Sequence, residues 1–224
     1  MVFPLQVQLS RSAYASVAHR YWRLDWTPEH NRDVYGADAS VYGIGNNLRL
    51  EPQLLAPPEV DEVLLDRPLL RLKSLMDHRC LFEDVEAFQT LPSTLERITE
   101  YLATELFAQP LWVGHWDSMT VWETARLGYT CRAGSRMAQL HFKKRNLILT
   151  LAATVDLETG LSFSRETLDS AVEKVFAAQA STSELDLTRW SQQLFEALKL
   201  ELKPLQRLRI DLGRHQYLLV QSDS

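Results

Sequence analysis

The order of periodic segments constrains the fold of this chain more than any other feature. Residues 6–22 are rich in residues that favour strands, and an alternating second strand begins at Leu48. Two segments with apolar residues at helical spacing follow, and residues 119–132 alternate around Gly128, which predicts a hairpin. The first 132 residues therefore predict the order ββααββ. The helical stripes are Leu65, Leu69, Leu72 and Met76, then Leu95, Ile98, Leu102 and Leu106 behind Ser93 or Thr94 as N-cap.

The same order returns in the second part of the chain. Residues 132–136 read as a junction, and residues 138–142 and 147–155 are strand-like, with a turn at 156–160. Two helical stripes and two closing strands at 208–212 and 217–220 complete a second ββααββ pattern. The stripes are Leu168, Val172, Val175 and Phe176, then Leu187, Trp190, Leu194 and Leu198.

We therefore expect an α+β fold in two units, residues 5–132 and 136–222, each with an antiparallel sheet and two helices on one face. The alternative is a single α+β domain in which eight strands happen to fall in that order. Residues 23–47 between the first two strands are predicted to form a polar loop, and Pro57-Pro58 is predicted to end the second strand.

Composition excludes several classes of function. The chain has 224 residues, with 24 basic and 29 acidic side chains and a net charge of -5, and no basic stripe interleaved with aromatics predicts nucleic-acid binding. Cys80 and Cys131 lack the spacing of a zinc knuckle and are predicted to be reduced thiols. No signal peptide and no apolar run of about 18 residues is found, so we expect a cytoplasmic protein without a membrane partner.

Six short motifs occur in a fixed order between residues 10 and 132. They contain His19-Arg20, Glu29 to Gly36, Gly43 to Leu48, Asp77-His78, Thr94-Leu95-Glu96, and Val121-Trp122-Glu123-Thr124. In this order and at these spacings they resemble motifs of the 6-pyruvoyl-tetrahydropterin and 6-carboxytetrahydropterin synthases. The corresponding family elements read Ala-Ser-His-Arg, Glu-Glu-Asn-x-x-x-Phe-Gly, His-Gly-His-Asn-Tyr, Leu-Asp-His-x-x-Leu, Thr-x-Glu-Asn and Val-x-Glu-Thr.

The resemblance implies the tunnelling fold, in which ββααββ units associate into a barrel between subunits. It therefore implies a homo-oligomer, since the open sheet edges are closed by association. The second unit shares with this family mainly residues 156–161, so we interpret it as a sparser copy that serves assembly. Asp211 stands near the position of the first unit's Glu123, but it shares its strand face with Arg207 and Arg209 and is predicted to be a surface charge.

The zinc site that the resemblance implies is incomplete. In the family three histidines hold the metal, and His19 matches the first of them. Ile44 and Asn46 stand where the other two belong, and neither is a good zinc ligand. We therefore predict a divergent member of the family without metal or other cofactor. Asp38, His30 and Asp33 in the long loop are the alternative ligands that could join His19.

The remaining motifs supply candidate site residues. The resemblance implies that Asp77 and His78 form a catalytic dyad and that Asp38, near the position of the family's cysteine, acts as a general base. It also implies that Glu123 binds the 2-amino pyrimidinone edge of a pterin, with Thr94 and Thr124 as further ligand-binding residues. The structural alternatives are a turn role for Asp38, capping for Asp77-His78 and an exposed strand carboxylate for Glu123. Glu123 shares its face with Met119 and Val121, which favours the anchor.

Three functions compete at this point. We favour a zinc-free protein that binds a pterin or related heterocycle through Glu123 and has lost the metal-dependent chemistry. The second is a lyase with altered chemistry that uses Asp77, His78 and Asp38. The third is a structural or regulatory protein that binds a protein partner and no heterocycle.

Overall fold

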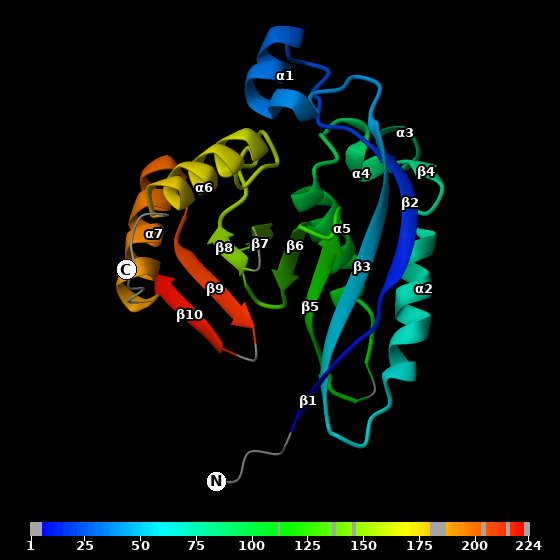
Figure 1. The fold of residues 1–224 in the computed structure, drawn as a ribbon. Helices are drawn as coiled ribbons and strands as arrows, with labels where there is room; N and C mark the ends of the chain where they lie inside the picture. Colours follow the sequence, from blue (N-terminus) through cyan, green and yellow to red (C-terminus); the bar gives the residue numbers. More distant parts are fainter. Residues whose placement is uncertain are drawn as a thin grey trace.

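The computed structural model of this chain describes residues 6–111, 113–135, 138–144, 147–179, 187–202, 205–213 and 216–221. In these residues a single curved sheet of ten strands runs through the molecule (Figure 1). The strands are β1 Val7–Ser10, β2 Ala13–His19, β3 Ile44–Ala56, β4 Arg79–Cys80, β5 His115–Trp122, β6 Leu127–Arg132, β7 Ala138–Lys144, β8 Leu147–Ala153, β9 Arg207–Gly213 and β10 Gln216–Gln221.

Neighbouring strands follow the order β10-β9-β8-β7-β6-β5-β3-β2-β4, and β1 also pairs with β3. All of these pairs are antiparallel except the short pair between β2 and β4. The helices are α1 Pro28–Tyr35, α2 Asp66–Ser74, α3 Leu81–Asp84, α4 Glu86–Gln89, α5 Leu95–Phe107, α6 Arg165–Gln179 and α7 Leu187–Glu201, with 3-10 turns η1 Gly36–Asp38 and η2 Glu62–Leu65.

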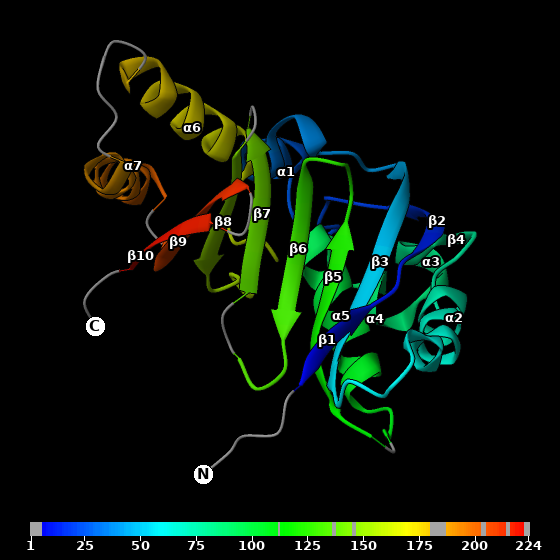
Figure 2. The same cartoon turned by 60° about the horizontal axis from the view of Figure 1, so that its bottom comes forward.

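The long helices cover one face of the sheet. Helix α5 packs on β5 and β6, α2 packs on β2 and β3, and α7 packs on β9 and β10, while the opposite, concave face carries no helix in the part of the chain that the structure describes (Figure 2). Alternate strand residues such as Leu48, Leu50 and Leu149 are fully buried under these helices, as period-two alternation requires. The predicted α+β class, with an antiparallel sheet and helices on one face, is confirmed.

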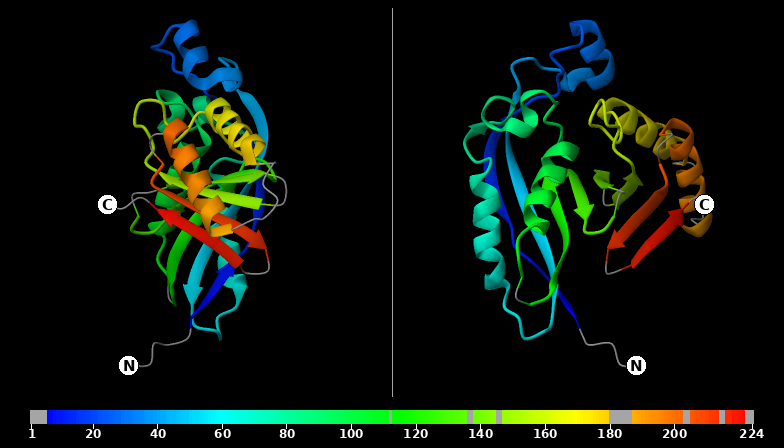
Figure 3. Two further views of the ribbon diagram at one scale, coloured as in Figure 1. Left: turned by 60° about the vertical axis from the view of Figure 1, so that its left-hand side comes forward. Right: turned by 180° about the vertical axis from the view of Figure 1, so that it is seen from behind.

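The two halves of the chain repeat one element order within this sheet. The N-terminal half has β2, β3, α2, α5, β5 and β6, and the C-terminal half has β7, β8, α6, α7, β9 and β10. The two halves lie side by side in Figure 3, and pairing of β6 with β7 joins them. The buried apolar residues of both halves form one cluster. The division at 5–132 and 136–222 stays a prediction, and residues 5, 136 and 222 lie outside the described residues.

The predicted polar loop at residues 23–47 was wrong for its central part. Helix α1 forms there because Thr27 caps it, with its hydroxyl accepting from the backbone N–H of His30, and Pro28 occupies the first turn. Glu29 in the same turn complements the helix dipole. In addition β3 begins at Ile44 rather than Leu48, so the motif carrying Asn46 lies within a strand.

The predicted hairpin turn at Gly128 was also misplaced. Gly128 lies inside β6, opposite Trp122, and a Cβ atom there would overlap the indole of Trp122. The glycine therefore makes room for an aromatic ring lying flat on the sheet, and residues 123–126 make the turn instead. None of the described helices is both long and apolar enough to cross a membrane.

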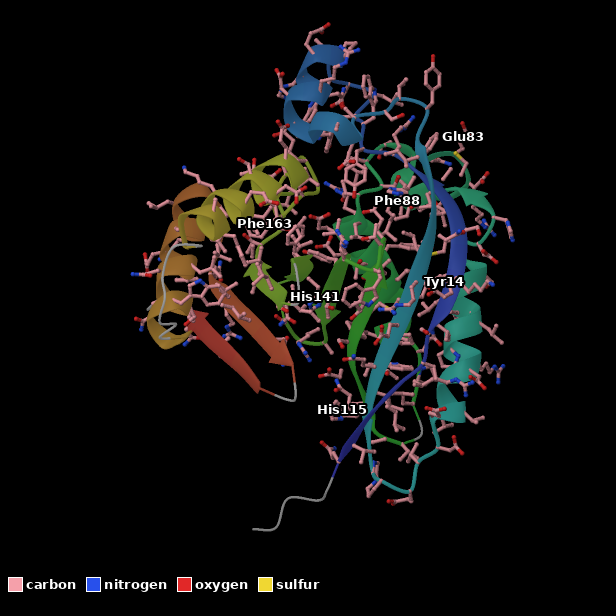
Figure 4. All side chains as sticks on the ribbon, viewed as in Figure 1. Tyr14, Glu83, Phe88, His115, His141 and Phe163 are labelled. Atoms are coloured by element: carbon pink, nitrogen blue, oxygen red, sulfur yellow. The ribbon has the colours of Figure 1, made fainter. Side chains whose placement is uncertain are left out.

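A row of polar side chains crosses the concave face between the two halves. His141 of β7 hydrogen-bonds Thr130 of β6 through Nε2 at 2.7 Å and Thr150 of β8 through Nδ1 at 3.1 Å, and Thr130 contacts Thr120 of β5 at 2.7 Å. The ring of His141 also stacks on Trp122, with centroids 5.4 Å apart. His141 lies near the middle of the sheet (Figure 4), so this row bonds the two halves together.

Burial, with Arg132 and Arg209 nearby, lowers the pKa of His141 from 6.5 to about 4, although Asp211 acts in the opposite direction. Because the unfolded chain takes up this proton more readily, the free energy of unfolding should fall as the pH drops from 6.5 towards 4, by up to about 3 kcal/mol. Urea denaturation across this pH range, compared with His141→Gln, isolates the effect. Equal pH slopes in the two proteins would contradict the prediction.

Candidate functional site

His19 ends β2 and is fully buried. Its Nδ1 lies 3.1 Å from the carbonyl oxygen of Ser93, and since a carbonyl only accepts, Nδ1 carries the proton in this contact. The hydroxyl of Ser93 accepts from the backbone N–H of Arg20 at 2.7 Å, which holds the two segments together. These bonds orient the ring so that Nε2 points away from Ser93, towards β3 and β5.

Asn46 meets His19 from the neighbouring strand β3. Its Nδ2 lies 3.1 Å from Nε2 of His19 and 3.0 Å from Oε1 of Glu123. One amide NH2 group has two hydrogens, so it donates to the imidazole nitrogen and to the carboxylate at the same time. We call these three side chains the His19–Asn46–Glu123 cluster.

Glu123 follows directly after β5, and its side chain is only 2% exposed. It shares its face with Met119 and Val121, both fully buried, as the alternation of the strand predicts. Oε1 lies 3.4 Å from Nε2 of His19, and the backbone N–H of Glu123 donates to the carbonyl of Leu127, which closes the hairpin turn. A carboxylate held among apolar neighbours requires donors, and the Asn46 amide supplies one.

The donor set does not fit the three-imidazole zinc site that the resemblance implies. Ile44 pairs directly with His19 across the strands and offers no ligand atom, and Asn46 directs its amide nitrogen at the imidazole. No three His, Cys, Asp or Glu side chains come together as metal ligands in the described ranges. The two alternative ligands on α1 lie elsewhere. The ring of His30 packs against Trp26, which precedes the helix, and Asp33 is exposed.

Asp77 and His78 lie at the outer edge of β2. The backbone N–H of Ser16 donates to Asp77 at 2.8 Å, and this bond, followed by Lys73 and His78, lowers the pKa of the Asp77 carboxyl. His78 has a positive φ of 59° and a side chain that is 82% exposed, with Nε2 3.8 Å from the Asp77 carboxylate. The imidazole projects into solvent rather than onto the carboxylate, and the catalytic dyad stays a prediction.

Asp38 and His78 lie in separate grooves within one chain. His78 lines an open groove of about 590 Å³ with Ser16, Asn46 and Asn47, among others. Asp38 lines another of about 670 Å³, formed with Tyr35 and the acidic residues Glu166, Asp169 and Glu173 of α6. The two sets of lining residues do not overlap, so a single chain does not bring Asp38 to the dyad.

The two threonines predicted to bind ligand make internal bonds. Thr94 is the N-cap of α5, as expected, and its hydroxyl donates to the carbonyl of Gly160 in the C-terminal half at 2.6 Å. Thr124 is exposed, and its hydroxyl accepts from the backbone N–H groups of Arg126 and Leu127. Thr124 therefore shapes the turn that presents Glu123.

Sequence reasoning missed two residues of this site. Asn46 was interpreted only as a lost ligand, although an amide beside a histidine and a buried carboxylate is a natural bridge between them. The role of Ser93 depends on contacts between segments more than 70 residues apart, and no local pattern reports such contacts.

Replacing Asn46 by Ala should lower the free energy of unfolding by about 1–3 kcal/mol, because the amide donor to the buried Glu123 carboxylate is removed. Urea denaturation at neutral pH measures this. Asn47→Ala is the matched control, since Asn47 is exposed on the same strand, and it should change stability by no more than about 0.5 kcal/mol. Equal losses in both variants would count against the cluster.

Placing imidazoles at positions 44 and 46 should create a metal site. The double variant Ile44→His with Asn46→His should retain about one zinc per chain after dialysis, because three imidazoles then converge beside β2. Elemental analysis of the double variant, the wild type and the single variant Asn46→His is the test. Retention of zinc by the wild type at the same level would overturn our account of the donor set.

Comparison with known proteins agrees with this architecture. No protein-family model and no curated protein sequence matches the chain. Among solved structures, the 6-pyruvoyl tetrahydropterin synthase of Caenorhabditis elegans matches with a TM-score of 0.52 and 24% sequence identity, over 60% of this chain and all of that one. An uncharacterised protein of Wolinella succinogenes matches with a TM-score of 0.42 and 16% identity, over 58% of this chain and 99% of that one. The chain thus carries the fold of a 6-pyruvoyl tetrahydropterin synthase.

Proposed function

We propose that this chain is a zinc-free protein that binds a pterin or related heterocycle through Glu123. The observation that carries the proposal is the bond from the Asn46 amide to the buried Glu123 carboxylate. This bond supports the proposal because it shows that the carboxylate accepts from an N–H donor, as it would from a ring N–H. The similarity of fold to a pterin synthase supports this choice of ligand class.

A ligand can bind Glu123 if its ring N–H groups replace the Asn46 amide as donors to the carboxylate. Asn46 is half-exposed on β3, whereas His19 and Glu123 are buried, so the amide is the member of the cluster with room to move. A planar ring with a 2-amino group beside a ring N–H presents two parallel donors, which match the two oxygens of a carboxylate. The ring would replace one hydrogen bond with two.

A structural protein without a heterocycle is the second candidate. The observation that favours it is that His19, Asn46 and Glu123 already hydrogen-bond one another, so the cluster is stable without a ligand. On this reading the buried carboxylate only fixes β2, β3 and β5 together, and the protein acts through a protein partner.

A lyase with altered chemistry is less well supported. Its possible helper Asp38 lies in a different groove from His78 within one chain, and the His78 imidazole projects into solvent. Without zinc, several kcal/mol of transition-state stabilisation would also have to come from other groups.

We further propose a homo-oligomer formed through the sheet edges. Strand β10 has only β9 beside it in the described residues, and β4 covers β2 only at Val17 and Ala18. Exposed strand edges of this kind associate with other strands. Inside the chain, the last strand of the N-terminal half, β6, pairs with the first strand of the C-terminal half, β7. Pairing between the edge strands of two chains would be of the same kind.

Titration of the purified protein with pterin, followed by the fluorescence of the ring, tests ligand binding. Glu123→Gln should weaken binding at least about tenfold, because one oxygen that accepts a ring N–H becomes an amide donor. Arg126→Ala, an exposed change in the same turn, should leave the affinity unchanged.

Lumazine is the matched ligand control, since it lacks the 2-amino group, and it should bind at least tenfold more weakly than pterin. Failure of the wild type to bind pterin at millimolar concentration would reject the proposal and favour the structural candidate.

The oligomer is tested by light scattering after gel filtration. The wild type should have a mass that is a multiple of 25.8 kDa, and Tyr14→Pro should shift it towards 25.8 kDa. Tyr14 is 61% exposed, and its N–H lies on the same outer edge of β2 as that of Ser16, so proline removes an edge donor only. Tyr14→Thr is the control. A monomeric wild type would contradict the proposal.

A further inference from the structure

Two buried acceptor atoms face each other in the His19–Asn46–Glu123 cluster. Nε2 of His19 lies 3.4 Å from Oε1 of Glu123, and the two side chains are 0% and 2% exposed. Because the Nδ1 hydrogen of His19 is directed at the Ser93 carbonyl, Nε2 of the neutral imidazole carries a lone pair. A lone pair and a carboxylate oxygen repel each other at this separation. The two atoms therefore require a hydrogen-bond donor that serves both of them.

Such a donor has to carry two hydrogens. The Asn46 amide does, and its Nδ2 lies 3.1 Å from Nε2 of His19 and 3.0 Å from Oε1 of Glu123. The opposite orientation of the amide would turn its carbonyl oxygen towards both acceptors. A hydroxyl or a ring N–H has a single hydrogen and would satisfy only one of the two atoms. The space between His19 and Glu123 is thus suited to an NH2 group.

The imidazole of His19 is held in the orientation that makes Nε2 an acceptor. Ser93, whose carbonyl accepts from Nδ1, is tied to the end of β2 by two further bonds. The backbone N–H of Arg20 donates to the Ser93 hydroxyl at 2.7 Å, and the Ser93 N–H donates to the Arg20 carbonyl at 2.9 Å. Tyr21 packs edge-on against the imidazole, with ring centroids 5.5 Å apart. Turning the ring to present a hydrogen beside Glu123 would break the bond to Ser93.

Asn46 is the member of the cluster that also reaches open space. With Ala18 and Gly45 it lines the open groove of about 590 Å³, whereas His19 and Glu123 do not line that groove. Nothing lies within 4 Å of the point where a Cβ atom on Gly45 would stand, so the groove is unobstructed next to Asn46. A ligand that entered from the groove would meet the Asn46 amide before it met the two acceptors.

We propose that His19 determines which heterocycles the Glu123 site accepts. Its Nε2 receives the second hydrogen of a primary amino group on the ligand, and the first hydrogen of that group goes to Glu123. The ligand amino group thus takes the place of the Asn46 amide nitrogen, one NH2 group for another. This inference rests on the proposed function, and it adds a requirement that Glu123 alone does not impose, namely an amino group without substituents.

A change at the ligand amino group shows why His19 would make the site selective. A methylamino group has one hydrogen, so it can bond Glu123 but turns its methyl group towards the lone pair of His19. A buried acceptor left without a donor weakens binding. Without Nε2 of His19, the carboxylate would take one hydrogen from either group and would distinguish the two ligands poorly.

NMR of the ligand-free protein with isotope-labelled histidine tests the state of His19. At neutral pH its ring should be neutral, with the hydrogen on Nδ1 and with Nε2 accepting a hydrogen bond. A hydrogen on Nε2, or a charged ring, would overturn the proposal, because neither leaves an acceptor beside Glu123.

Binding of two related rings tests the selectivity. The wild type should bind pterin at least about tenfold more tightly than the same ring with a methylamino group in place of the amino group. In His19→Asn this preference should fall below about threefold, because the new amide can donate to Ser93 in place of Nδ1 but has no atom at the position of Nε2. Arg126→Ala is the matched control, an exposed change in the turn after Glu123, and should keep the wild-type preference.

The outcomes separate this proposal from the proposed function. Equal binding of the two rings by the wild type would overturn the role of His19 and leave pterin binding through Glu123 intact. An unchanged preference in His19→Asn would overturn it as well. Should His19→Asn fail to fold, the wild-type preference and the NMR measurement decide the proposal. No binding of pterin by the wild type would reject the proposed function and, with it, the role of His19.

Discussion

The buried carboxylate of Glu123 needs hydrogen-bond donors, and the packing around it supplies them. Glu123 lies among fully buried apolar residues, and an ion in such a place is tolerated only where hydrogen-bond donors surround it. The Asn46 amide supplies one donor, and the same amide also donates to His19, whose other nitrogen bonds the Ser93 carbonyl. This chain of contacts joins β2, β3 and the turn after β5 to the residues that precede α5.

Much of this fold was predictable, because the alternation of β3, β5 and β8 and the apolar stripes of α2, α5 and α7 are local patterns. The cap of α5 by Thr94 was also predictable, since such capping is local. Helix α1 was missed, although Thr27, Pro28 and Glu29 form a recognisable helix start. The glycines and asparagines of residues 23–47 favour turns, so the whole segment was predicted to be a loop. Gly128 was misread because the sequence does not reveal that the Trp122 ring covers it.

The candidate site was predictable in its members but not in its arrangement. The burial of Glu123 follows from strand alternation, and the poor zinc-binding chemistry of Ile44 and Asn46 can be read directly from the residue types. The bond from Asn46 to Glu123 depends on two strands brought together from positions 77 residues apart. The bonds from Thr94 and Glu96 to the C-terminal half depend on how the two halves pack, and no short motif encodes that packing.

The polar row on the concave face has a direction. Each threonine hydroxyl has one proton to donate, and a neutral imidazole has one nitrogen that donates and one that accepts. If Nε2 of His141 carries the proton, it donates to the hydroxyl of Thr130, so Thr130 donates its own hydrogen bond to Thr120. Thr150 then donates to Nδ1. If Nδ1 carries it, every bond in the row reverses. The side-chain dipoles across β5, β6, β7 and β8 are therefore coupled, and a change of tautomer at one ring reorients hydroxyl groups in both halves of the protein.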